Sequence, residues 1–323
     1  MIRTVALVVI TASCLGIANA THWLSSNPSS GPQGAQSTLQ ERLGYPADAK
    51  LLIVHADDLA MAHSVNTATI KAFESGLVNS GSIMIPCPWL PEIAAYAQSH
   101  PEADLGLHLT LTSEWRFYRW GPVLSKDRVS SLLDNNGYLY PTETEAASHV
   151  KATEVEAEIR AQIDRARAFG IKPTHLDSHM GTLYQNRTLF EVLLRVGRDN
   201  RLPVLLPKDM LASTDMSSVL NKNDIVIDRM ITIGPSVPAD GWSKFYSDAI
   251  KSLQPGVTEL IVHIAYDDEE MRGATADHPD WGAAWRQRDF QFLTSDTFRR
   301  LLKENSIKLV TWREIGKAQY RER

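Results

Sequence analysis

The chain has 323 residues, of which 43% are hydrophobic, so it can bury one large core and has a normal size for a single α/β barrel. Lys and Arg number 33 against 38 Asp and Glu, which gives a formal net charge of −5. No cluster of Lys and Arg indicates a nucleic-acid partner.

The first 20 residues have the three parts of a secretory signal. Arg3 precedes an apolar stretch from Val5 to Ala18, and Ala18-Asn19-Ala20 is a typical cleavage site. We therefore expect cleavage near Ala20 and an exported protein, either periplasmic or secreted. The apolar stretch is too short for a stable membrane span.

The alternative at the N-terminus is a lipoprotein signal that ends at Cys14. Thr11, three residues before Cys14, is a poor residue for such a signal. If Cys14 leaves with the signal, Cys87 is the only cysteine of the mature chain, and no intramolecular disulfide can form. Residues 25–40 are rich in Ser, Gly, Pro and Gln, and we expect a flexible leader over 21–45. We expect the catalytic domain over 46–323.

Beyond the leader, strand-like and helix-like segments alternate. Strands are predicted near 51–56, 81–86, 104–109, 173–177, 203–206, 225–232, 258–264 and 307–311. Helices are predicted near 64–75, 90–99, 153–169, 186–199, 244–253 and 295–304. This alternation predicts an α/β fold with one parallel, barrel-like sheet wrapped by helices.

The helix at 153–169 can be predicted in more detail. Thr153 and Glu156 have the spacing of a capping box. The inner face is predicted at the positions Val155, Ile159, Ile163, Ala166 and Phe169. Gly170 then ends the helix, so the following strand begins near Thr174.

The dipeptide Asp57-Asp58 ends the apolar run 51–56. A buried parallel strand would deliver both carboxylates to its carboxyl edge, where active sites of such folds lie. Because neighbouring like charges repel, the pair predicts a positive charge close by, most simply a metal ion. The alternative is that either Asp only caps the helix that follows.

Histidines end three other strand-like segments, at His108, at His175 to His179, and at His263. The alternation of strands and helices brings such ends together at one edge. One carboxylate and two imidazoles form a ligand set for zinc or a similar divalent ion, with positions left open for water and substrate. The second Asp is then free to act as a base.

Several short motifs carry a family resemblance. They are His55-Ala56-Asp57-Asp58, Val78-Asn79-Ser80-Gly81-Ser82, Gly106 to Thr112, His175-Leu176-Asp177-Ser178-His179, and Glu259 to His263 before Tyr266-Asp267-Asp268. In this order and spacing the chain resembles the YdjC-like carbohydrate deacetylases, the ChbG/HpnK family. Two departures are Met180-Gly181, where the family often has further histidines, and Ile264-Ala265, where it often has Pro-Gly.

The resemblance implies a distorted (β/α) barrel of the polysaccharide-deacetylase type and a hydrolase that acts on carbon–nitrogen bonds other than peptide bonds. Its substrate would be an N-acetylated amino sugar or oligosaccharide. Asp58, His108 and His179 would hold one divalent ion, with zinc expected first and magnesium, manganese or cobalt also compatible. Asp57 would act as the base, and His263, as imidazolium, would protonate the departing amine.

Further residues are expected around this centre. His175 and Asp177 are expected to orient the ligands, with His175 as the alternative ligand to His179. Sugar stacking is predicted for three tryptophans in polar, non-periodic surroundings, Trp115, Trp120 and Trp281. His55 and His63 are predicted to be structural.

Two other functions stay open. The chain could be another metal-dependent amide or ester hydrolase on the same fold, which product analysis would distinguish from a deacetylase. It could also be a non-catalytic glycan-binding protein, which would hold its ligand unchanged and bind it regardless of a chelator.

Overall fold

The computed structural model describes residues 37–212 and 214–320. The predicted signal, residues 1–20, and residues 21–36 of the predicted leader lie outside these ranges. Residues 37–45 were expected in the leader, but they include helix α1 (Leu39–Arg42), closed by a capping box between Thr38 and Glu41. Leu39 and Leu43 pack against the core, so the folded domain begins before the predicted boundary at residue 46.

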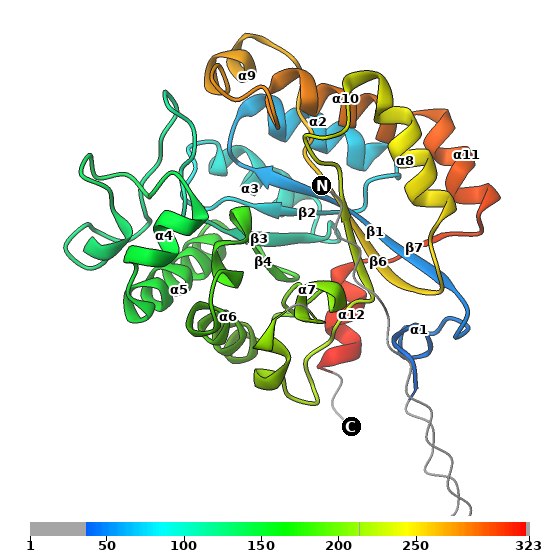
Figure 1. Ribbon diagram of the computed structural model, residues 1–323, viewed down its shortest axis with the longest axis horizontal. Coiled ribbons are helices and arrows are strands. Elements are labelled where there is room, and N and C mark those ends of the chain that lie inside the picture. The colour runs from blue at the N-terminus through cyan, green and yellow to red at the C-terminus, as the bar shows by residue number, and fades with distance from the viewer. Residues whose placement is uncertain (1–36, 213, 321–323) are drawn as a thin grey trace, which may run out of the picture. The chain divides into compact units, whose positions relative to one another are not determined.

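Parallel strands form a single curled sheet with helices packed around it, as predicted (Figure 1). The strands are β1 (Lys50–Leu59), β2 (Ser80–Ile83), β3 (Leu105–Leu109), β4 (Leu176–Ser178), β5 (Arg229–Thr232), β6 (Gly256–Val262) and β7 (Lys308–Leu309). Their order is β4-β3-β2-β1-β6-β5, and β7 pairs with the first half of β1. The central strand, β1, is therefore the one that carries Asp57 and Asp58.

The strand predicted at 203–206 is reduced to single bridges. Leu176 pairs with Val204 and Pro207 pairs with Ile227, both in parallel, which continues the curl from β4 toward β5. Pro203 and Pro207 have no N–H to donate, and this limits a longer ladder here.

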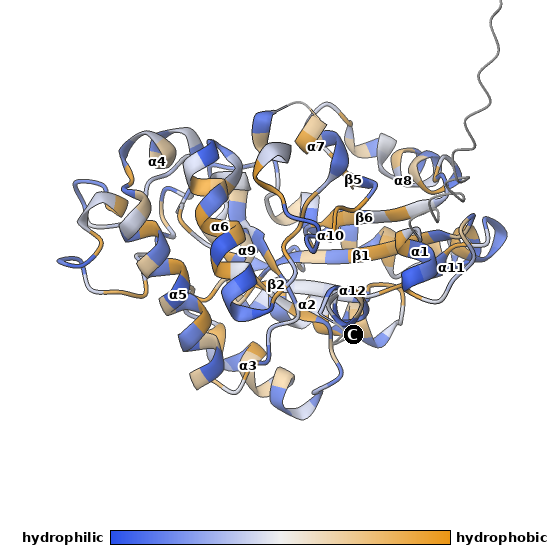
Figure 2. Ribbon diagram, turned by 90° about the horizontal axis from the view of Figure 1, so that it is seen from below, coloured by the Kyte–Doolittle hydropathy of each residue, from blue (hydrophilic) through white to orange (hydrophobic). Residues whose placement is uncertain are grey.

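The helices of the described residues are α2 (His63–Glu74), α3 (Leu90–Ser99), α4 (Glu143–His149), α5 (Ala152–Ala168), α6 (Arg187–Asn200), α7 (Lys208–Ala212), α8 (Trp242–Lys251), α9 (Glu269–Ala274), α10 (Ala283–Leu293), α11 (Asp296–Glu304) and α12 (Trp312–Gln319). Apolar residues concentrate along β1 and β6, at the centre of the sheet (Figure 2). None of these helices is long and apolar enough to cross a membrane.

Helix α5 differs from its prediction at its start. Lys151 is the N-cap and no side chain caps the helix, so the predicted capping box of Thr153 and Glu156 is wrong. Glu156 is instead engaged by Arg160 and Arg195 through ion pairs. The predicted inner face is confirmed at the buried positions Val155, Ile159, Ile163 and Ala166.

Candidate metal centre and active site

An irregularity at the end of β1 brings Asp57 and Asp58 to the same site. Consecutive side chains of a regular strand point to opposite faces. The register between β1 and β2 shifts between Ala56 and Leu59, and Asp58 takes a φ of 69°, in the left-handed region that Asp tolerates better than most residues. Such a bulge re-aims side chains. Both carboxylates consequently approach Nε2 of His108, at 3.8 Å for Asp57 and 3.5 Å for Asp58.

The three predicted metal ligands meet around one oxygen atom. Oδ1 of Asp58 lies 3.5 Å from Nε2 of His108 and 3.4 Å from Nδ1 of His179. This oxygen is buried and has no hydrogen-bond partner among the described residues, an arrangement that costs free energy unless a cation binds. The donor atoms are close enough together to hold one ion. The residues therefore fit a divalent metal.

The second oxygen of Asp58 is held by Arg286, from helix α10. Nη2 of Arg286 donates to Oδ2 of Asp58 at 2.7 Å. Burial disfavours the ionised carboxyl, but the Arg286 guanidinium, with His179, keeps the pKa of Asp58 well below its usual range. The helices predicted from the sequence do not include α10, although Trp285, Asp289 and Phe292 follow one another at helical spacing and could have indicated it.

Each of the two imidazoles that face Asp58 is also contacted at its other nitrogen by a carboxylate. Nδ1 of His108 lies 2.8 Å from Oδ1 of Asp177, the residue expected to orient a ligand. Nε2 of His179 lies 3.0 Å from Oε2 of Glu114, which sequence reasoning missed. Burial alone would lower the pKa of His179, but Glu114 and Asp58 raise it to about 10. The site thus favours positive charge at this position.

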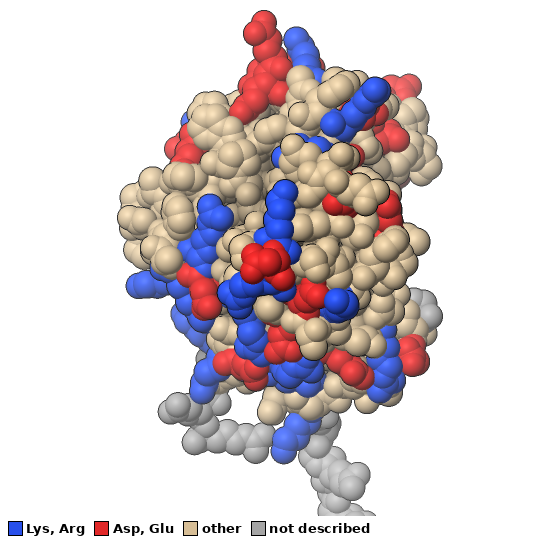
Figure 3. Space-filling model, turned by 90° about the vertical axis from the view of Figure 1, so that its left-hand side faces the viewer, with Lys and Arg blue, Asp and Glu red and all other residues tan. Residues whose placement is uncertain are grey.

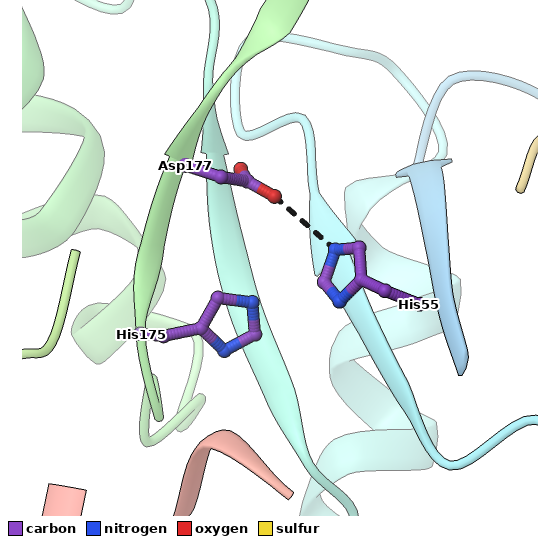
Figure 4. A group of neighbouring side chains, drawn as sticks. All are labelled: His55, His175 and Asp177. Atoms are coloured by element: carbon purple, nitrogen blue, oxygen red, sulfur yellow. Dashed lines mark ion pairs between the residues drawn. The ribbon is translucent and has the colours of Figure 1, made fainter. Parts of the chain in front are cut away.

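A buried polar layer lies beneath the two aspartates. Nε2 of His55 is 3.1 Å from Oδ2 of Asp177 (Figure 4). The same nitrogen is 3.1 Å from Oδ1 of Asp57, and Nδ1 of His55 is 3.4 Å from Glu259. Burial works against a charged imidazole, but the hydrogen bonds to Asp177 and Asp57 raise the pKa of His55 well above its ordinary value. His55, predicted to be only structural, therefore supports the carboxylates of Asp57 and Asp177.

His175 does not face Asp58. Its ring stacks on Trp312 at 5.1 Å between centroids and meets the edge of His55 at 5.0 Å. Burial and the neighbouring His55 lower the pKa of His175 well below its ordinary value, so it is neutral. His55, His175 and Asp177 are also close enough to hold an ion, but both nitrogens of His55 already face carboxylates.

His263 follows β6 and faces Asp57. Its Nε2 is 3.9 Å from Oδ2 of Asp57, and its backbone N–H donates to Asp289 of helix α10 at 3.0 Å. Asp289 in turn accepts hydrogen bonds from Trp242 and Tyr246. Burial lowers the pKa of His263 to about 4, so the imidazole is neutral at rest. To act as the expected imidazolium, His263 must therefore gain a proton during the reaction, because it does not carry one in the resting enzyme.

Two of the three predicted sugar-stacking residues lack the exposed ring face that stacking requires. Trp115 is 2% exposed and Trp120 is 5% exposed, and their rings pack edge to face at 5.9 Å. Both lie in the loop that follows β3, and their side chains belong to the hydrophobic core. Trp281 is half-buried and packs against Trp285 at 5.2 Å, so its stacking role stays a prediction.

The chain matches known proteins over most of its length. A family model described as YdjC-like protein matches residues 51–304. A carbohydrate deacetylase of Thermus thermophilus is 32% identical over 293 residues, which cover 87% of this chain and 99% of that protein. A carbohydrate deacetylase of Enterococcus faecalis is 33% identical over 280 residues, which cover 83% of this chain and 98% of that protein.

A solved structure supports the same relationship. It is a protein of Enterococcus faecalis described as a candidate cellobiose-phosphate cleavage protein, with a TM-score of 0.68 and 26% sequence identity. The superposition covers 83% of this chain and 99% of that one. Because the family model spans most of the chain and the relatives match over nearly their whole length, this protein belongs to the YdjC-like family.

Proposed function

We propose that this protein is a metal-dependent carbohydrate deacetylase that removes the acetyl group from an N-acetylated amino sugar or oligosaccharide. The observation that carries the proposal is Oδ1 of Asp58, which has no hydrogen-bond partner among the described residues and lies 3.5 Å from Nε2 of His108 and 3.4 Å from Nδ1 of His179. A second carboxylate, Asp57, lies beside it. The relatives named carbohydrate deacetylase support the choice of substrate class.

Asp58, His108 and His179 would hold the ion, and zinc suits a set of two imidazoles and one carboxylate. An ion bound by these three residues would supply Lewis-acid chemistry, polarising the acetyl carbonyl and lowering the pKa of a water molecule. Arg286 occupies one oxygen of Asp58 and leaves the other free. The protein therefore presents a single, oriented carboxylate oxygen to the ion.

Asp57 is positioned to act as the general base. Its Oδ1 is held by Nε2 of His55 at 3.1 Å and by the Ser82 hydroxyl at 3.3 Å. Its Oδ2 faces His108 and His263 instead, and this oxygen can take a proton from the attacking water. One oxygen thus fixes the carboxylate while the other reacts.

His263 is positioned to act as the acid once it has been protonated. The proton would leave the water for Oδ2 of Asp57 and pass to Nε2 of His263, once these two atoms, 3.9 Å apart at rest, come within hydrogen-bond distance. From Nε2 of His263 the proton would reach the departing amine nitrogen. Because the pKa of His263 is about 4, the imidazolium gives up this proton readily. The products are acetate and a free amino sugar.

Loops at the carboxyl edge supply a surface for the sugar. The large hydrophobic side chains exposed among the described residues all lie on loops after β2, β3 or β4, at Trp89, Phe117, Tyr138 and Met180. The segment 110–142 occupies the left-hand side of Figure 1. Figure 3, which faces that side, shows an uncharged area in its upper half, between charged side chains at the top and those in the centre and lower half. Uncharged and aromatic surfaces suit a neutral sugar ring.

A zinc titration of the purified protein tests the metal, with His108→Ala for comparison, and acetate release from N-acetylglucosamine and its β-linked oligomers tests the reaction. We expect about one tightly bound ion, lost in the variant, as for a mononuclear centre. No specific ion in the wild type would refute the mechanism. Release of another acid would favour a different amidase or esterase, and binding of glycan unaffected by chelator would favour a glycan-binding protein.

The predicted signal, residues 1–20, supports a further proposal, that the deacetylase is exported and acts in the periplasm or outside the cell.

A further inference from the structure

The two imidazoles that face Asp58 are held in the same way by different parts of the fold. His108 directs Nε2 at Asp58 and Nδ1 at Asp177, which comes from the neighbouring strand β4. His179 directs Nδ1 at Asp58 and Nε2 at Glu114, which comes from the loop after β3. In each case one ring nitrogen faces the candidate ion and the other faces a carboxylate.

We propose that Glu114 is a positioning residue for the metal ligand His179. A carboxylate that accepts the Nε2–H of His179 fixes the tautomer in which Nδ1 has a free lone pair directed at Asp58. The same contact fixes the rotation of the ring. This inference rests on the metal centre of the proposed function.

His179 depends on such a contact because the backbone after it is irregular. It begins a short 3-10 turn, His179–Tyr184, in which Met180 and Gly181 both have a positive φ, of 52° and 67°. The ring therefore extends from the junction between β4 and a turn, not from the interior of a regular element. Partners at both nitrogens determine its direction.

Glu114 is itself held firmly between two buried residues. The N–H of Ser113 donates to the carbonyl of Tyr140 at 2.8 Å, and the Ser113 hydroxyl accepts from the N–H of Trp120 at 2.9 Å. Trp115, on the other side, is 2% exposed. Trp115 and Trp120, first predicted to stack on sugar, thus anchor the loop that carries Glu114.

The Glu114 side chain is only 12% exposed, so solvent screens its contact with His179 little. Two effects can then be separated, the position of the oxygen and the negative charge. Glu114→Asp keeps the charge but withdraws the oxygen by one methylene, whereas Glu114→Gln keeps an acceptor of the same reach but removes the charge. Glu114→Ala removes both.

The experiment measures the zinc affinity of the wild type and these three variants by competition with a chromophoric chelator. Glu102→Gln is the matched control because it removes one exposed carboxylate just before β3, at the opposite end of the strand. If Glu114 positions His179, the Glu114→Ala and Glu114→Asp variants bind zinc about 10- to 100-fold more weakly than the wild type. Glu114→Gln weakens zinc binding less, and the control Glu102→Gln leaves it unchanged.

Three outcomes would contradict the inference. Wild-type affinity in Glu114→Ala would show that His179 needs no such partner. Wild-type affinity in Glu114→Asp with a loss in Glu114→Gln would show that only the charge matters. In a His179→Ala background, a further change of coordination number in the cobalt absorption spectrum on adding Glu114→Ala would show that Glu114 is itself a ligand.

Failure of the inference and failure of the metal centre are distinguishable. If the wild type binds no zinc, the proposed function fails before the variants are compared. If the wild type binds zinc but the variants do not differ from it, only the role of Glu114 fails. Thermal unfolding of each metal-free variant checks its fold, and the comparison of Asp with Gln decides the question if Ala does not fold.

Discussion

Replacing Asp57 with Asn tests the assignment of the general base. Asn has the same size, and its carbonyl oxygen can still accept hydrogen bonds from Ser82 and His55, so the end of β1 should keep its shape. The amide nitrogen, which cannot accept a proton, then takes the place of the oxygen 3.9 Å from His263. Asp58, His108 and His179 are unchanged, and we expect the ion to stay bound.

Loss of a positioned general base typically lowers the rate by a factor of about 10² to 10⁴. At about 1.4 kcal/mol for each tenfold change, this raises the activation free energy by about 3 to 5 kcal/mol. The assay is the kcat for acetate release at saturating zinc, which excludes any loss of affinity caused by the removed charge.

Asp177→Asn serves as the comparison, because Asp177 contacts the ligand His108 and not the reacting atoms. We expect this variant to need more zinc and to regain most of its kcat at saturation. A near-normal kcat in Asp57→Asn under the same conditions would refute the assignment of Asp57 as the base.

Three further predictions concern Glu259, Trp115 and Trp281. Burial raises the pKa of Glu259 to about 7, so between its unfolded value of 4.5 and that pKa the folded state holds a proton that the unfolded chain releases. The contribution of Glu259 to the free energy of unfolding is fully present below pH 4.5. It decreases as the pH rises from 4.5 through about 7, by at most about 3 kcal/mol in total. Glu259→Gln should therefore gain stability relative to the metal-free wild type from about pH 5 to about pH 8 in urea unfolding, and parallel curves would contradict this. Trp115→Ala should cost about 3–5 kcal/mol and lower the Tm, whereas the half-buried Trp281 should affect KM more than Tm when replaced by Ala. An unchanged Tm with a raised KM in Trp115→Ala would restore its stacking role.

The sequence was sufficient for the parallel α/β fold and for the edge at which the site lies. Apolar runs such as 51–56 and the apolar spacing of helix α5 are local patterns, and local patterns determine where elements form. Asp57, Asp58, His108, His179 and His263 were identified because each ends a strand-like segment. The sequence pattern predicted a strand at 203–206, but only single bridges form there. Pro203 and Pro207 lack the backbone N–H groups that a longer ladder needs.

Only the tertiary structure decided which atoms of these residues meet and what holds them. The contact of Asp58 with Arg286 joins positions 228 residues apart, and that of His179 with Glu114 joins positions 65 apart. No local period links such pairs, because they meet only through the curl of the sheet and the packing of loops on it. The same packing buried Trp115 and Trp120 and placed His55 beneath Asp57 and Asp177. Burial and partners are properties of the folded surroundings, and a residue's identity and spacing do not determine them.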